Sequence, residues 1–175
     1  NLYVYSYKGK LLIVDMGLGF ADEYYPGVEL LVPDISFLIE NKDKIAGLVL
    51  THGHEDHIGA IQYLWNELRP TIYTSKFTST VLKTKLAEEG IVNDVKIFEL
   101  GYNSKFKVGP FDIELVHLTH SIPEMHGFVL RTEKGNIFHT GDWKFDKDPL
   151  IGPATNFDKL KKIGDEGILA MVCDS

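Results

Sequence analysis

The segment 51–59, which reads THGHEDHIG, constrains this chain more than any other. It places three histidines and Asp56 within six residues. Imidazole and carboxylate groups together suit zinc or a similar divalent ion. One tetrahedral site seldom takes four ligands from a single loop, so the segment predicts a loop that serves two metal ions.

The residues around this loop support the same interpretation. An apolar run precedes it and predicts a strand over 48–51. Residues two apart on an extended chain point the same way, so His52 and His54 are placed to bind one ion. Apolar residues at helical spacing then predict a helix over 57–68, with Asp56 as its N-cap. The turn into this helix directs Asp56 and His57 toward a second ion.

Other interpretations of the loop fit less well. A lone histidine is usually a packed or solvated side chain, but several candidate ligands between a strand and a helix favour metal binding. A zincin requires His-Glu-x-x-His, and Ile58 stands where its second His should be. A zinc deaminase requires a pair of cysteines, and this chain has one.

Composition indicates a single soluble domain. The chain has 175 residues, of which 44% are apolar and 25% are charged. No apolar run approaches the roughly 20 residues that cross a membrane, so we expect no membrane association. Cys173 follows an apolar run and is expected to be buried, in a reducing, cytoplasmic setting. The chain begins without Met and stops after a strand-like run, so we expect a fragment.

The formal charge of −7 argues against broad nonspecific binding of nucleic acid. Two bound dications would reverse the sign of the charge near the loop. The overall charge is therefore compatible with a substrate that carries phosphate.

Along the rest of the chain, hairpin signals and strand–helix alternation occur together. Together they predict a mixed sheet with helices on its outer faces. The glycines near residue 17 do not form a dinucleotide-binding loop, because the third glycine is absent and Pro26 interrupts the required helix. We expect strands over 2–7, 11–14, 48–51, 71–74, 95–100, 105–108, 111–118, 127–132, 136–139 and 168–172, and helices over 34–44, 57–68, 76–88 and 156–163.

Two more candidate ligands follow predicted strands. His120 comes two residues after 111–118, and Asp142 comes after 136–138. Ligands gather where strands end in loops. Taken alone, each residue is as typical of a solvated or structural role as of a metal ligand. Because the metal loop is also present, we expect both to be ligands.

These residues now match a known family. His52-x-His54-x-Asp56-His57, followed by His120 and Asp142, resembles the signature of the metallo-β-lactamase superfamily. Within it, the chain is similar to the ribonuclease J family of the β-CASP nuclease group. The resemblance is carried by segments 33–36, 51–60, 119–123 and 139–146.

The resemblance implies a four-layer αβ/βα sandwich, of the α/β class, with residues 1–175 forming a partial metallo-β-lactamase domain. It implies two zinc ions, with manganese or magnesium as alternatives. His52, His54 and His120 would hold the first ion, Asp56 and His57 the second, and Asp142 both. Asp56 and Asp142 would be catalytic, and Asp15 would support the ligand loop.

The implied activity is RNA phosphodiester hydrolysis, endonucleolytic or 5′→3′ exonucleolytic, by a hydroxide that the two zinc ions activate. The implied partners are RNA and, for the full-length protein, further copies of itself. The family takes one more His from beyond an inserted β-CASP domain, and both lie outside this chain, so we expect the fragment alone to lack full activity. Two alternatives stay open: a related hydrolase of thioesters, lactones or β-lactams, and a non-catalytic RNA-binding scaffold subunit.

Overall fold

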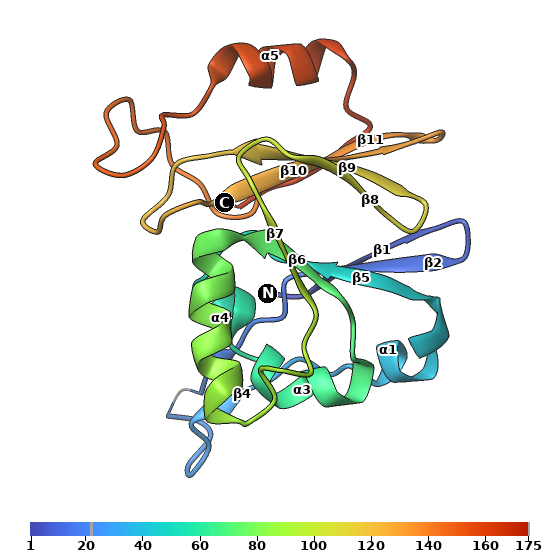
Figure 1. Cartoon of the computed structure of the whole chain (residues 1–175), viewed down its shortest axis with the longest axis vertical. Coiled ribbons are helices and arrows are strands. Elements are labelled where there is room, and N and C mark those ends of the chain that lie inside the picture. Colours follow the sequence, from blue (N-terminus) through green and yellow to red (C-terminus); the bar gives the residue numbers. More distant parts are fainter. Residues whose placement is uncertain (22, 175) are drawn as a thin grey trace.

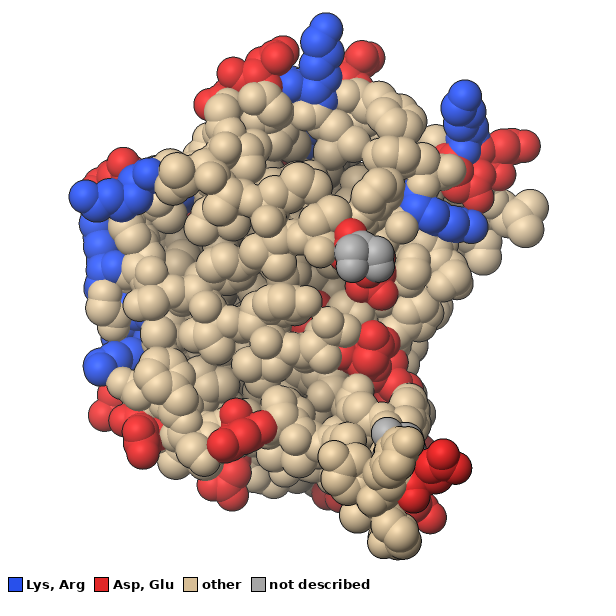
Figure 2. Space-filling view, turned by 180° about the vertical axis from the view of Figure 1, so that it is seen from behind, with Lys and Arg blue, Asp and Glu red and all other residues tan. Residues whose placement is uncertain are grey.

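The computed structural model describes residues 1–21 and 23–174 as two five-stranded sheets, with helices outside each sheet (Figure 1). Figure 2 shows the opposite face. The order of layers is helix, sheet, sheet, helix, which confirms the predicted αβ/βα sandwich.

The first sheet is mixed. Its outer strand pairs antiparallel with the next strand through a hairpin, and the remaining neighbours are parallel. Parallel strands end at one edge of a sheet, so the loops that follow them meet there. In spatial order the strands are β1 (Tyr3–Tyr7), β2 (Lys10–Val14), β5 (Ile45–Val49), β6 (Ile72–Ser75) and β7 (Ile97–Leu100).

The second sheet is antiparallel except where β11 meets β12. Because β9 and β11 both run antiparallel to β10, their carboxyl ends lie at the same edge. In spatial order the strands are β12 (Ala170–Val172), β11 (Gly135–His139), β10 (His126–Thr132), β9 (Phe111–His117) and β8 (Lys105–Val108).

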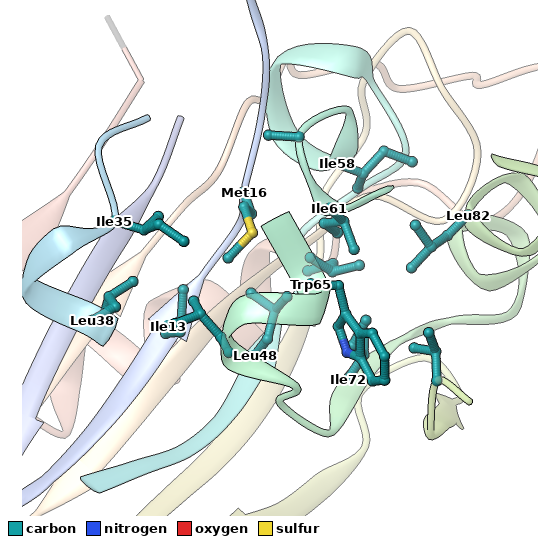
Figure 3. Packing of buried hydrophobic residues seen from close by; sticks show 14 of the residues in the cluster. Ile13, Met16, Ile35, Leu38, Leu48, Ile58, Ile61, Trp65, Ile72 and Leu82 are labelled. Atoms are coloured by element: carbon teal, nitrogen blue, oxygen red, sulfur yellow. The ribbon is translucent and has the colours of Figure 1, made fainter. Parts of the chain in front are cut away.

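Helices cover the outer face of each sheet (Figure 1). A large apolar cluster packs the helices of the N-terminal half on the first sheet, and Ile61 and Trp65 of α3 are among its buried members (Figure 3). Burying a side chain of this size contributes roughly 1.5–3 kcal/mol. A second cluster lies between the sheets and a third lies under α5. The helices are α1 (Ser36–Glu40), a 3-10 turn (Lys42–Lys44), α2 (Glu55–Ile58), α3 (Ile61–Leu68), α4 (Lys76–Glu88) and α5 (Phe157–Asp165).

The helix predicted over 57–68 is divided into α2 and α3. In a continuous helix the carbonyl of Asp56 would accept a hydrogen bond from the backbone N–H of Ala60. Instead Ala60 donates to Met16 O at 3.1 Å, and Asp56 O accepts from the backbone nitrogen of Asn1 at 2.8 Å. The predicted N-cap is also wrong, because His54 is the residue before α2 and Asp56 lies inside it.

Two other expectations need correction. No strand is predicted between residues 14 and 34, but Leu30–Leu31 (β4) pairs there with Gly19–Phe20 (β3). Cys173 is exposed, not buried, because it follows β12 at the edge of the second sheet.

The helix predicted over 34–44 begins at Ser36, whose backbone N–H donates to the carboxylate of Asp34 at 2.9 Å. It ends at Glu40 and is followed by the 3-10 turn. Among the described residues, no helix combines the length and the apolar character that a membrane span requires.

Candidate metal centre

The candidate centre lies where strands of both sheets end. His54, the residue before α2, has an extended backbone conformation, and its ring meets that of His52 in the same space. His52 Nε2 lies 3.0 Å from His54 Nδ1, and His52 is fully buried.

His120 and Asp142 reach this space from the second sheet. The His120 ring lies 5.1 Å from that of His52 and 5.0 Å from that of His54, between centroids. Its Nε2 is 3.8 Å from Asp142 Oδ2. One ligand atom from each of these four residues lies within 4.8 Å of all the others.

A second group of possible ligands shares Asp142 with the first. His57 Nε2 lies 3.2 Å from Asp142 Oδ1 and 3.4 Å from Asp56 Oδ2. The three ligand atoms again lie within 4.8 Å of one another. The structure thus brings together all six residues expected from the sequence, with Asp142 between the two groups.

Asp15 lies behind these candidate ligands and is fully buried. Its Oδ1 accepts from the backbone N–H of Thr51 at 2.8 Å. Its Oδ2 accepts from the Thr51 hydroxyl and from His57 Nδ1, both at 2.8 Å. Its backbone has a φ of +56°, a left-handed conformation that Asp tolerates better than most residues.

These bonds determine which nitrogen of each ring carries the proton. A carboxylate can only accept, so His57 carries a proton on Nδ1, and in the neutral ring the lone pair lies on Nε2, toward the second group. The Thr51 hydroxyl donates to Asp15 and is therefore free to accept from His52 Nδ1, 3.0 Å away. His52 Nε2 then also keeps its lone pair. Carboxylate–histidine contacts of this kind orient ligands in many metal sites.

Burial keeps two of the candidate ligand rings in their neutral form. Burial, aided by the charge of His57, lowers the pKa of His52 to about 3, and burial also lowers the pKa of His120. Both rings are therefore neutral at pH 7, as metal ligation requires. Burial alone would lower the pKa of His57, but the hydrogen bond and charge of Asp15 outweigh it and raise that pKa. Burial would likewise raise the pKa of Asp15, and His57 outweighs it and lowers that pKa.

The backbone that follows β2 holds α2 in place. Met16 N donates to His57 O at 2.7 Å, and Leu18 N donates to Glu55 O at 2.9 Å. Gly17 lies between them, and a Cβ added there would stand 1.7 Å from Asp56 O. Only glycine lets the two segments approach so closely, and this approach sets the position of Asp56 and His57.

Gly141 has a similar role next to Asp142. Its φ is +58°, and an added Cβ would stand 2.5 Å from Met125 Cε and 3.1 Å from Thr51 Cβ. A side chain at position 141 would therefore be strained by its φ and would require Met125 and Thr51 to shift.

Lys144 and Asp146 form an ion pair nearby. Lys144 Nζ lies 3.4 Å from Asp146 Oδ2, and both side chains are partly exposed. The pair lies outside the two ligand groups and has the character of a surface ion pair.

One residue at the centre has no signature in the sequence. Asn1 places its side-chain amide nitrogen 2.9 Å from Asp56 Oδ2 and 3.0 Å from His57 Nε2. The two contacts span 55 and 56 residues, and a local pattern does not report such contacts.

The residues fit divalent cations. Their donors are imidazole nitrogens and carboxylate oxygens, a set that suits zinc and neighbouring metals. At least two rings keep a lone pair directed into the shared space. One carboxylate, that of Asp142, belongs to both groups and could therefore contact two adjacent cations.

Comparison with known proteins agrees with this geometry. A family model described as a beta-lactamase superfamily domain matches residues 14–159. Ribonuclease J of Sinorhizobium meliloti is 42% identical over 177 aligned positions, which cover 100% of this chain and 31% of that protein. Ribonuclease J of Thermus thermophilus is 38% identical, over 100% of this chain and 32% of that protein. The chain therefore spans about a third of the length of these curated relatives.

Solved structures share the fold at low sequence identity. The metallo-beta-lactamase fold protein YhfI from Bacillus subtilis has a TM-score of 0.59 at 17% identity, over 83% of this chain and 56% of that chain. Zn(2+)-bound PqqB from Methylobacterium extorquens has a TM-score of 0.56 at 14% identity, over 80% of this chain and 52% of that chain. At these identities the likeness shows the fold alone.

Proposed function

The chain belongs to the beta-lactamase superfamily, and from that premise we propose that it forms the metal-binding domain of a ribonuclease J-like RNA hydrolase. The observation that carries the proposal is the pair of ligand groups joined at Asp142. Similarity to ribonucleases J over the whole chain supports RNA as the substrate. The longer protein would act in the cytoplasm, as an oligomer of identical subunits.

In this proposal His52, His54 and His120 hold one divalent cation and Asp56 and His57 hold another. Zinc is our first choice for both, because imidazole nitrogen dominates the donors. When bound, two such cations offset the negative charge of a phosphodiester and make water more acidic.

The side chains of the chain perform the remaining tasks. Asp142 contacts both groups and fixes their separation. Asp15 keeps the proton of His57 on Nδ1. Half of the Asp56 side chain (51%) is exposed, so its free oxygen can accept a hydrogen bond from an attacking water. Asp56 and Asp142 are therefore the residues we assign to catalysis.

The charge distribution is consistent with cations at the centre. On the face drawn in Figure 2, most Lys and Arg side chains stand at the rim of the molecule, and acidic side chains lie both beside them at the rim and farther in on the face. The chain as a whole carries a formal charge of −7. Cations held at the centre would favour the binding of a polyanion there, because their charge would dominate locally.

Cleavage of a model RNA by the longer protein tests the proposal. We expect His54→Ala and Asp142→Asn each to lower the rate at least about a hundredfold. Asp94→Asn, an exposed change outside the centre, is the matched control and should cleave normally. Faster turnover of nitrocefin or a glutathione thioester than of RNA would instead indicate another hydrolase of the superfamily. Undiminished RNA cleavage by both variants would refute the proposed centre.

A further inference from the structure

The side chain of Asn1 lies against the second ligand group. Its Nδ2 donates to Asp56 Oδ2 at 2.9 Å and lies 3.0 Å from His57 Nε2. These two partners, with Asp142, make up the group. Asn1 thus contacts two of the three candidate ligands of the second cation, Asp56 and His57. Among the described residues, it has no hydrogen bond to the histidines of the first group.

The orientation of this amide follows from its partners. Tyr3 donates its hydroxyl hydrogen to Asn1 Oδ1 at 3.2 Å. The carboxylate of Asp56 can only accept, so the group of the Asn1 amide that contacts it must be the NH₂. The amide nitrogen must therefore face Asp56 and His57, and the amide oxygen must face Tyr3.

The backbone of Asn1 is held by hydrogen bonds to α2 and to the segment after β2. Its nitrogen donates to Asp56 O at 2.8 Å, and its carbonyl accepts from Gly17 N at 2.8 Å. The amide is thus attached to the segment that also holds α2. Reorientation of the amide would break contacts at both ends of the side chain.

Asp56 needs such a partner more than the other candidate ligands do. Half of its side chain is exposed, and it belongs to a helix of only four residues. A free carboxylate on so short a helix can rotate toward water. The bond from Asn1 holds Oδ2 on the side of His57 Nε2, 3.4 Å away.

We propose that Asn1 is a positioning residue for the second cation: its amide holds the carboxylate of Asp56 toward His57, so that both ligands are in place before a cation binds. The inference rests on the two-cation centre of the proposed function. It makes no use of the RNA substrate.

Metal binding by the longer protein tests this inference without any activity measurement. The metal-free protein is titrated with Co²⁺, and binding is followed by calorimetry and by visible absorption, which reports the coordination of each ion. We expect Asn1→Ala to weaken the second Co²⁺ about 10–100-fold and to leave the first unchanged. Tyr3→Phe retains the Asn1 amide but removes the hydrogen bond that orients it. This variant should therefore show a smaller loss of affinity, and only for the second ion.

Asn66→Ala, at an exposed position of α3, is the matched control and should bind both ions as the unmodified protein does. Equal weakening of both ions in Asn1→Ala would show a general structural role and overturn the inference. The inference is also overturned if Asn1→Ala and Tyr3→Phe both bind the second ion as tightly as the unmodified protein does. If Asn1→Ala does not fold, Tyr3→Phe alone decides the question. If the unmodified protein binds two ions but does not cleave RNA, the proposed function is refuted and this inference still stands.

Discussion

Replacement of Asp15 by Asn tests the hydrogen bonds behind the candidate ligands. The change conserves volume, and the oxygen of the introduced amide can still accept from the backbone of Thr51. Its NH₂ group, however, replaces the oxygen that now accepts from the Thr51 hydroxyl and from His57 Nδ1, both at 2.8 Å. Both partners must then turn from donors into acceptors.

The size of the effect follows from these two bonds. A hydrogen bond to a charged group contributes about 1.5–3 kcal/mol and a neutral one about 0.5–1.5 kcal/mol. Exchanging two charged bonds for neutral ones should lower the free energy of unfolding by about 2 kcal/mol. His57 would also move its proton to Nε2, which removes the lone pair that faces Asp56 and Asp142. Affinity for the second cation should fall about 10–100-fold.

Urea unfolding of the metal-free protein and calorimetric titration with Zn²⁺ measure these two quantities. Thr51→Ser retains the hydroxyl and is the matched control: its affinity for Zn²⁺ should not change, and the loss of one buried methyl group should lower the free energy of unfolding by only about 1 kcal/mol. The reasoning is refuted if Asp15→Asn binds the second Zn²⁺ as tightly as the unmodified protein. A loss of stability alone would mean that Asp15 serves the fold and not the ligands.

Two further predictions concern packing and pH. Gly17→Ala should lower the free energy of unfolding by about 3 kcal/mol, because its Cβ would overlap Asp56 O. Gly164→Ala in α5, where an added Cβ meets nothing within 4 Å, should instead be neutral or stabilise by about 0.5–1 kcal/mol; equal effects in the two urea titrations would contradict the packing argument. Burial lowers the pKa of His126 to about 4, so the unfolded state binds more protons between pH 4 and its own pKa of about 6.5. The stabilisation from the neutral ring is complete above about pH 6.5 and is lost as the pH falls toward 4, by up to about 3 kcal/mol. In metal-free protein, His126→Leu should reduce the change of the free energy of unfolding between pH 4 and 6.5. If the variant and the unmodified protein depend on pH equally, the prediction is wrong.

Much of the fold follows from local patterns in the sequence. Residues 76–88 form α4 as predicted, because Ser75 caps the helix through Thr78 N and Leu82 and Leu86 fall on its buried side. The predicted strands are found within about three residues of their bounds, since alternation and turn residues set strand length. The candidate ligands could be named from the sequence because the loop 51–59 concentrates four of them.

The errors arise where distant segments decide local structure. The break between α2 and α3 depends on Met16 and Asn1, which take the hydrogen bonds of a continuous helix. The exposure of Cys173 depends on the place of β12 at the edge of its sheet, which its apolar neighbours do not reveal. The contact of Asn1 with Asp56 depends on the register of both segments against Gly17. None of these three features has a signature within a short window of sequence.

Anomalous diffraction from crystals of the longer protein, grown with excess Zn²⁺, tests the central claim most directly. The structure predicts two peaks about 3.5–4 Å apart, one among His52, His54 and His120 and one between Asp56 and His57, with Asp142 in contact with both. A single peak, or none within reach of Asp142, would contradict the shared-carboxylate centre and the function proposed from it.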